Sequence, residues 1–138
     1  MGLVTTVAIV GSREFPDLHL VRGFVGRLRA NTTVISGGAQ GVDCAAELAA
    51  KRRGLRTRVL EADWDRLGRR AGPVRNTTLV KAADHVVAFW DGASPGTRDT
   101  IRKALRAKKM WCVVWPDGSE WRPGAGQTEV PRWREARP

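Results

Sequence analysis

The sequence predicts a single α/β domain, built as a three-layer sandwich around a mainly parallel sheet of five strands. Short apolar, β-branched runs alternate along the chain with longer segments of helical spacing, which is the pattern of βαβ units. The length of 138 residues suits one domain with one hydrophobic core. Because βαβ crossovers are right-handed, we expect parallel strands with helices on both faces of the sheet.

The five predicted strands are short apolar runs bounded by Gly, Pro or polar residues. In chain order they cover residues 4–10, 33–36, 58–61, 85–90 and 110–115. The first is an apolar, β-branched run that ends directly at Gly11.

Predicted helices fill the intervals between the strands. Apolar residues recur at helical spacing after Asp17, which we expect to cap the first helix. The other helices are expected at residues 42–53, 73–83 and from about 97 to 108, and residues 62–72 are expected to form a polar loop that carries Trp64. After residue 115 the composition changes to Pro, Gly, Trp and charge. We therefore divide the chain into a domain at 1–115 and a tail at 116–138, which forms a hairpin on the sheet edge or reaches a partner subunit.

Composition narrows the function classes. The first residues lack the basic start and long apolar run of a signal peptide, and no stretch is long enough to span a bilayer, so we expect a cytoplasmic protein with no membrane contact. Cys44 and Cys112 lie far apart and outside any ligand spacing, so we interpret both as buried thiols and expect neither a disulfide nor a metal site. The net charge of +10 keeps nucleic acid open as a partner, although the basic residues are spread along the chain rather than gathered in one stripe.

Three glycine-containing loops follow predicted strands at the edge of the sheet where ligands of such folds bind. They are Gly11-Ser12-Arg13, the segment from Gly37 to Asp43, and the segment from Asp91 to Thr97. Glycine lets the backbone approach a ligand, and the first N–H groups of the following helix attract anions. Ser and Thr hydroxyls add donors, and Arg13 or Arg75 could grip a phosphate with two parallel hydrogen bonds. The loops therefore predict a phosphate-containing ligand.

The candidate ligand-binding residues share a place in or beside these loops. They are Gly11, Ser12, Arg13, Gly37, Gly38, Gly41, Asp43, Trp64, Arg75, Asn76, Ser94, Gly96 and Thr97. Trp64 is included because it follows a strand and could stack on a base. Neither a GxGxxG motif after the first strand nor a GxxxxGK[ST] motif is present, so nicotinamide redox chemistry and ATP hydrolysis of the usual kinds are set aside and no cofactor is expected.

Four segments together resemble a known family. They are residues 7–13 (VAIVGSR), 35–43 (ISGGAQGVD), 62–64 (ADW) with 71–76 (AGPVRN), and 91–97 (DGASPGT). In this order they look like the YspA, cpYpsA-related branch of the SLOG superfamily, which also holds the Lonely Guy phosphoribohydrolases and DNA-processing protein A. The resemblance covers residues up to about 115 and implies a Rossmann-like nucleotide-binding fold. It also implies self-association, as a homodimer or a higher even oligomer.

The resemblance implies catalytic roles only for residues that match the motif of the Lonely Guy enzymes. In the Lonely Guy enzymes a PGGxGTxxE loop holds the 5′-phosphate, and its Glu acts with an Arg of the preceding helix. Arg75 matches that Arg and Gly96-Thr97 matches the GT, but Thr100 stands in place of the Glu. Cleavage of an N-glycosidic bond needs a carboxylate near the ribose. Asp43 and Asp91 are the remaining candidates in the loops, with Asp43 expected chiefly to brace the second helix.

Three hypotheses remain from the sequence. The leading one is a domain that binds a nucleotide or nucleotide-derived small ligand, as a sensor, with phosphate at the two glycine-containing helix starts and Arg75 as its counter-charge. The second is hydrolysis of nucleoside 5′-monophosphates, with Arg75, Asp43 and Asp91 as catalytic candidates. The third is single-stranded DNA binding, as in DNA-processing protein A, whose loop resembles the Ser36 to Asp43 segment more closely.

Overall fold

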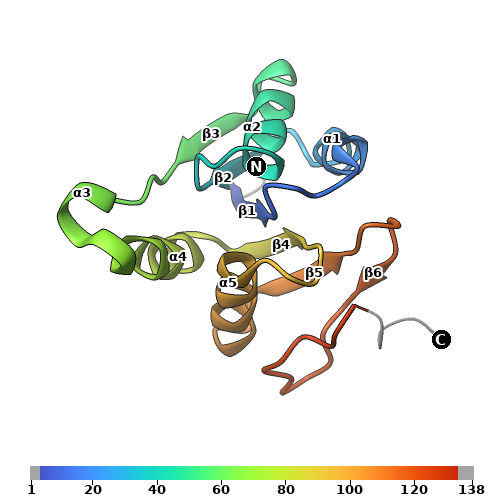
Figure 1. Ribbon diagram of the computed structural model, residues 1–138. Helices are drawn as coiled ribbons and strands as arrows, with labels where there is room; N and C mark the ends of the chain where they lie inside the picture. Colours follow the sequence, from blue (N-terminus) through green and yellow to red (C-terminus); the bar gives the residue numbers. More distant parts are fainter. Residues whose placement is uncertain (1–3, 134–138) are drawn as a thin grey trace.

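A computed structural model of the chain describes residues 4–133 as an α/β fold with one six-stranded sheet (Figure 1). The strands are β1 (Thr5–Gly11), β2 (Thr32–Ser36), β3 (Arg56–Val59), β4 (His85–Phe89), β5 (Met110–Val114) and β6 (Glu120–Trp121). The helices are α1 (Leu18–Gly26), α2 (Val42–Arg52), α3 (Trp64–Leu67), the 3₁₀ helix η1 (Gly68–Arg70), α4 (Ala71–Ala82) and α5 (Pro95–Arg106). The predicted α/β class is confirmed.

The strand order in the sheet is β3-β2-β1-β4-β5-β6. Every neighbouring pair from β3 to β5 is parallel, and β6 alone runs antiparallel, on the outer edge of β5. The chain proceeds outward from β1 through β2 to β3 and then returns to β4 on the other side of β1. A crevice therefore opens between the carboxyl ends of β1 and β4, where ligands bind in open sheets of this kind.

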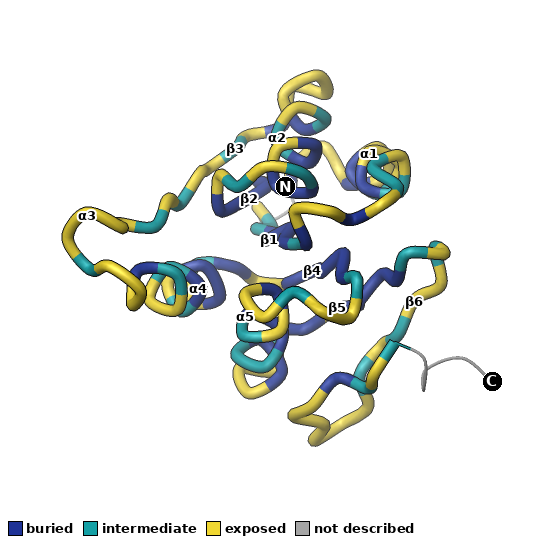
Figure 2. Tube along the Cα trace, viewed as in Figure 1, coloured by how far each residue is buried: buried dark blue, intermediate teal, exposed yellow. Residues whose placement is uncertain are grey.

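The central strands are buried on both faces because their alternate side chains enter two separate cores. Val7 and Ile9 of β1 pack with α1 and α2, whereas Ala8 and Val10 pack with α4 and α5. Figure 1 shows these two helix pairs on opposite sides of the sheet, and Figure 2 shows the central strands as its most buried part. Side chains of alternating direction on apolar strands thus produce the predicted three layers.

Three segments differ from the sequence prediction. The sheet has a sixth strand, because Glu120 and Trp121 pair with Val114 and Val113. The expected polar loop at Trp64 is helical, since Asp63 caps α3 by accepting the Arg66 N–H. α4 begins at Ala71, two residues earlier than predicted. β3 begins at Arg56, also two residues earlier than predicted.

The interpretation of both cysteines as buried is wrong for one of them. Cys112 is buried in β5, but Cys44 is exposed. The buried positions of α2 include 42, 45, 46 and 50, which form one helical face, and position 44 lies on the solvent side. Among residues 4–133, no helix has both the length and the apolar character that a membrane span requires.

Candidate functional site

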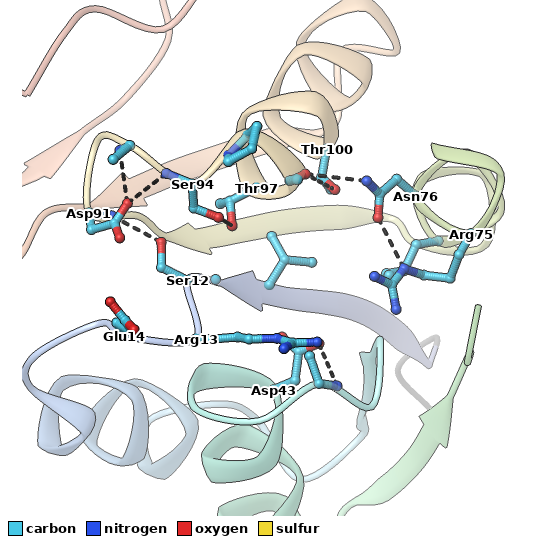
Figure 3. A pocket seen from close by; sticks show the side chains of 17 residues that line it. Ser12, Arg13, Glu14, Asp43, Arg75, Asn76, Asp91, Ser94, Thr97 and Thr100 are labelled. Carbon is cyan, nitrogen blue, oxygen red and sulfur yellow. Dashed lines mark hydrogen bonds between the residues drawn. The ribbon is translucent and has the colours of Figure 1, made fainter. Parts of the chain in front are cut away.

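A cavity of about 500 Å³ occupies the crevice at the carboxyl ends of β1 and β4, and we call it the central cavity (Figure 3). Three loops and one face of α4 and α5 enclose it. Its lining comprises Val10, Gly11, Ser12, Arg13, Glu14, Ala39, Asp43, Arg75, Asn76, Leu79, Asp91, Ala93, Ser94, Pro95, Gly96, Thr97 and Thr100. Its size falls in the range of small-ligand pockets, and most of its side chains are polar or charged.

The start of α5 forms one wall. Trp90 Nε1 donates a hydrogen bond to the Ser94 carbonyl (3.0 Å), which fixes the turn before the helix. Within the described chain the Ser94 side chain makes no capping bond to α5; its hydroxyl lies 3.1 Å from that of Thr97, and both residues line the cavity. A Cβ built on Gly96 would meet no heavy atom within 4 Å. The helix start therefore presents two hydroxyls and uncrowded backbone to the cavity, an arrangement that attracts anions.

Asp91 holds the loop that precedes α5. Its Oδ1 accepts the N–H groups of Ala93 (2.8 Å) and Ser94 (2.9 Å), and the Asp91 N–H donates to Ser12 Oγ (3.2 Å). Partial burial acts to raise the pKa of Asp91, but the hydrogen bonds from Ser94, Ala93 and Ser12 outweigh it and leave the pKa lowered. The carboxylate is thus ionised at neutral pH and ties the β4 loop to the β1 loop.

Asp43 braces the glycine-containing loop after β2. Its Oδ2 accepts the N–H groups of Gly37 (3.1 Å) and Ala39 (3.3 Å), and the residue is 5% exposed. Burial raises the pKa of Asp43 to about 6, although the amide hydrogen bonds and the charge of Arg75 act in the opposite direction. A buried carboxylate therefore occupies backbone donors of this loop that a phosphate would otherwise use.

Arg75 and Asn76 connect the loop after β2 with the start of α5. Arg75 Nη1 donates to the Gly37 carbonyl (2.6 Å), and its Nε donates to Asn76 Oδ1 (3.0 Å). The buried Asn76 amide in turn donates to the Gly96 carbonyl (3.2 Å) and to Asp99 (3.0 Å). Two residues of α4 thereby fix the position of a guanidinium relative to the helix start across the cavity.

The α5 side of the cavity carries no carboxylate among the described residues that line it. Thr100 is buried there, and its hydroxyl donates to the Gly96 carbonyl (3.3 Å). The Asp99 carboxylate lies outside the lining, held by Asn76 and by Lys103 (2.8 Å). The carboxylates that do line the cavity are Glu14 and Asp43, from the loops after β1 and β2, and Asp91, from the loop that precedes α5.

Most of the residues predicted from the sequence meet in this cavity, but four do not line it. Gly37 lies behind the Arg75 guanidinium, and Gly41 lies against the Arg13 backbone at a φ of 79°. Gly38 faces Val59 and Glu61 of the neighbouring strand end. Trp64 lies on α3 with its ring above Gly72.

The sequence prediction missed several lining residues. Glu14 follows Arg13 directly in the loop after β1, so its position beside two predicted residues was the available signal. Leu79 lies one helical turn beyond Asn76 on α4, and that spacing places both on one face. Across residues 4–133 no group of three or more His, Cys, Asp and Glu side chains is arranged to hold a metal ion.

The fold and the loop site define a Rossmann-like domain with an anion-attracting crevice, and comparison with known proteins places it in a family. Residues 5–67 match the model of the YspA, cpYpsA-related SLOG family. Gene 61 protein of Mycobacterium phage D29 is 35% identical over 111 residues, which cover 73% of this chain and 89% of the phage protein. The chain belongs to the YspA, cpYpsA-related SLOG family.

Solved structures share the fold at low sequence identity. DNA processing protein A (DprA) from Streptococcus pneumoniae has a TM-score of 0.70 at 19% identity, with 88% of this chain covering 51% of that one, about half its length. DprA from Helicobacter pylori, which binds single-stranded DNA, has a TM-score of 0.61 at 19% identity over 91% of this chain and 69% of that one. The protein TM1055 has a TM-score of 0.58 at 21% identity over 76% of this chain and 71% of that one.

Proposed function

We propose that the chain binds a nucleotide or nucleotide-derived small ligand in the central cavity and holds it without turning it over. The observation that carries the proposal is that Ser94, Gly96 and Thr97 at the start of α5 line the same cavity as Arg75. Helix N-termini with hydroxyl donors favour phosphate, and a guanidinium held by its neighbours binds such an anion with little loss of side-chain freedom. The phosphate lies at α5, with Arg75 and Arg13 as its counter-charges.

The role of a sensor rather than a hydrolase is supported by the carboxylates. Thr100 occupies the position on α5 where hydrolytic relatives carry Glu, and Asp99 is held away from the cavity lining. Asp91 and Asp43 are both engaged by backbone N–H groups. Release of free base from nucleoside monophosphates, followed by chromatography, tests this directly: measurable turnover would replace the sensor assignment with a phosphoribohydrolase.

Binding of single-stranded DNA is the competing function, supported by the shared fold with DprA and by the net charge of +10. Such binding weakens steeply with added salt because it depends on many phosphate contacts. The test is the affinity of the chain for a labelled oligonucleotide. An affinity that falls steeply with added salt, and that is the same in Arg75→Ala, would favour DNA binding at a surface outside the central cavity.

The experiment that tests the proposal is calorimetric titration with nucleoside mono- and diphosphates, ADP-ribose and NAD. At least one of them should bind. The substitution Arg75→Ala should lower the affinity for that ligand by about a hundredfold, because a charge-assisted hydrogen bond contributes about 1.5–3 kcal/mol. The matched control is Arg52→Ala, at the exposed end of α2, which should leave the ligand affinity unchanged. Thermal unfolding of both variants shows that they are folded. No binder in the panel would refute the proposal.

A further inference from the structure

A second cavity, of about 320 Å³, lies beside the central cavity at the carboxyl end of β3, and we call it the edge cavity. The end of β3, α3 and one face of α4 enclose it. Its lining comprises Val59, Leu60, Glu61, Asp63, Arg66, Leu67, Ala71, Val74, Arg75 and Thr78. Of these lining residues, the proposed function uses only Arg75.

The two cavities share one wall. Arg75 lines both of them, and the turn at Gly37 and Gly38 lies against Arg75 on one side and against Val59 and Glu61 on the other. A Cβ on Gly37 would collide with the Arg75 guanidinium, and a Cβ on Gly38 would come within 3.0 Å of Val59 and 3.2 Å of Glu61. Gly38 also has a φ of 75°, which other residues rarely adopt. Because Gly37 and Gly38 have no side chains, Arg75 can pack against the backbone at Gly37, and Val59 and Glu61 can pack against it at Gly38.

The edge cavity has the chemistry of a site for a planar ring. Val59 and Val74 are large apolar side chains that remain 37% and 48% exposed, one on β3 and one on α4. Leu60 and Leu67 extend this apolar lining. Half of the lining residues are apolar, and burying their surface under a ring is favourable.

Two carboxylates border this apolar surface, and they differ in their surroundings. Asp63 accepts both the backbone N–H of Arg66 (3.2 Å) and its Nε (3.0 Å), so it serves to cap α3. Glu61 is exposed at the rim, next to Gly38. A carboxylate accepts hydrogen bonds and donates none, so at this position it favours a ring that carries an amino group.

We propose that the edge cavity holds the base of the bound nucleotide, that Arg75 lies between base and phosphate, and that Glu61 favours bases with an exocyclic amino group. This inference rests on the proposed function, because it takes the phosphate to lie at the start of α5. Asn76 connects the two regions, because its amide donates to the Gly96 carbonyl (3.2 Å) and accepts from Arg75 Nε (3.0 Å). One amide group therefore separates the start of α5 from the guanidinium that also lines the edge cavity.

The test compares AMP with ribose 5-phosphate, which carries the same phosphate and sugar but no base. The native chain should bind AMP about tenfold more tightly, because the base buries apolar surface. Val74→Trp fills the edge cavity and should remove this advantage while leaving affinity for ribose 5-phosphate within about twofold. Leu48→Trp is the matched control, an exposed apolar residue on α2 outside both cavities, and should leave both affinities unchanged.

A second variant tests the amino-group preference. The native chain should bind AMP and CMP more tightly than UMP, and Glu61→Gln should narrow that difference because an amide can both donate and accept. Glu61 is exposed, so the substitution leaves the fold intact.

The outcomes separate the two proposals. Equal affinity of the native chain for AMP and ribose 5-phosphate, or an AMP advantage that Val74→Trp preserves, overturns the edge cavity as the base site while the phosphate site stands. An AMP preference over UMP that Glu61→Gln does not narrow overturns the role of Glu61. If neither AMP nor ribose 5-phosphate binds, the proposed function fails and this inference fails with it.

Discussion

The two glycine-containing helix starts of this protein have similar sequences and different surroundings. At α2, the Asp43 carboxylate accepts the Gly37 and Ala39 N–H groups, and the loop is closed by a buried side chain of the protein itself. At α5, the Ser94 and Thr97 hydroxyls bond each other and line the cavity. The sequence assigned phosphate to both starts. We propose α5 alone, because the Asp43 carboxylate already accepts the α2-loop N–H groups that an anion would need.

Glycine has a different role at each of these two helix starts. Gly41 precedes α2 at a φ of 79°, and a Cβ there would collide with the Arg13 backbone. Gly96 of α5 has uncrowded space in the direction of a Cβ. Packing therefore requires glycine at Gly41, before α2. At Gly96, in α5, the lack of a side chain leaves the backbone accessible from the cavity.

Matched alanine substitutions should give the largest difference between the two starts. Gly41→Ala combines a strained backbone with a backbone collision and should lower the free energy of unfolding by about 3 kcal/mol. Gly96→Ala meets open space and should change it by less than about 0.5 kcal/mol. Denaturant unfolding measures both values, and equal losses would show that the two glycines serve the same purpose.

The charge state of Asp43 should appear in the pH dependence of stability. Its pKa rises from 3.8 to about 6 on folding, so between these values the folded state holds more protons than the unfolded state. This group's contribution is therefore complete below pH 4 and declines by about 3 kcal/mol in total as pH rises through 6 to about 7. Asp43→Asn removes the titration, and the difference in unfolding free energy between native and variant chains should change over this interval. Parallel pH curves would contradict the assignment.

A smaller effect is expected at the α5 start when one hydroxyl is removed. Thr97→Val keeps the shape of the side chain but removes a donor to the phosphate, and should weaken AMP binding by about tenfold. Unfolding free energy should fall by no more than about 1 kcal/mol, because the hydroxyl is paired only with that of Ser94 among the described bonds. Thr77→Val on α4, whose hydroxyl donates to the Pro73 carbonyl, is the control. Equal AMP affinities for the two variants would exclude Thr97 from the phosphate site.

Local signals account for the parts of the fold that the sequence predicted. The apolar run of β1 and the Asp17 cap of α1 each depend on residues close together in the chain. The edge hairpin of β6 was only one of two alternatives for the tail, because two residues, Glu120 and Trp121, are too short for an alternating pattern. The helical turn at Trp64 was missed for a similar reason, since four residues show no helical period.

The site was predictable as a set of loops but not as a set of contacts. Loops after parallel strands meet at one edge of a sheet, which predicted that Ser12, Asp43 and Ser94 are neighbours. Arg75 was added for its charge and through the family resemblance. The bond between Arg75 and Gly37 joins residues 38 positions apart. That Asp43 turns back to the loop before α2, and that Glu14 enters the cavity, also depend on tertiary packing that no periodicity encodes.

The central claim is that the phosphate lies at the start of α5 and not at the loop braced by Asp43. Amide chemical shifts of the ¹⁵N-labelled chain, followed during titration with AMP, test it most directly. We predict that the largest shifts occur at Gly96 and Thr97, whose N–H groups would donate to the phosphate, with smaller shifts at Gly37 and Ala39. Large shifts at Gly37 and Ala39 with none at Gly96 and Thr97 would contradict the account.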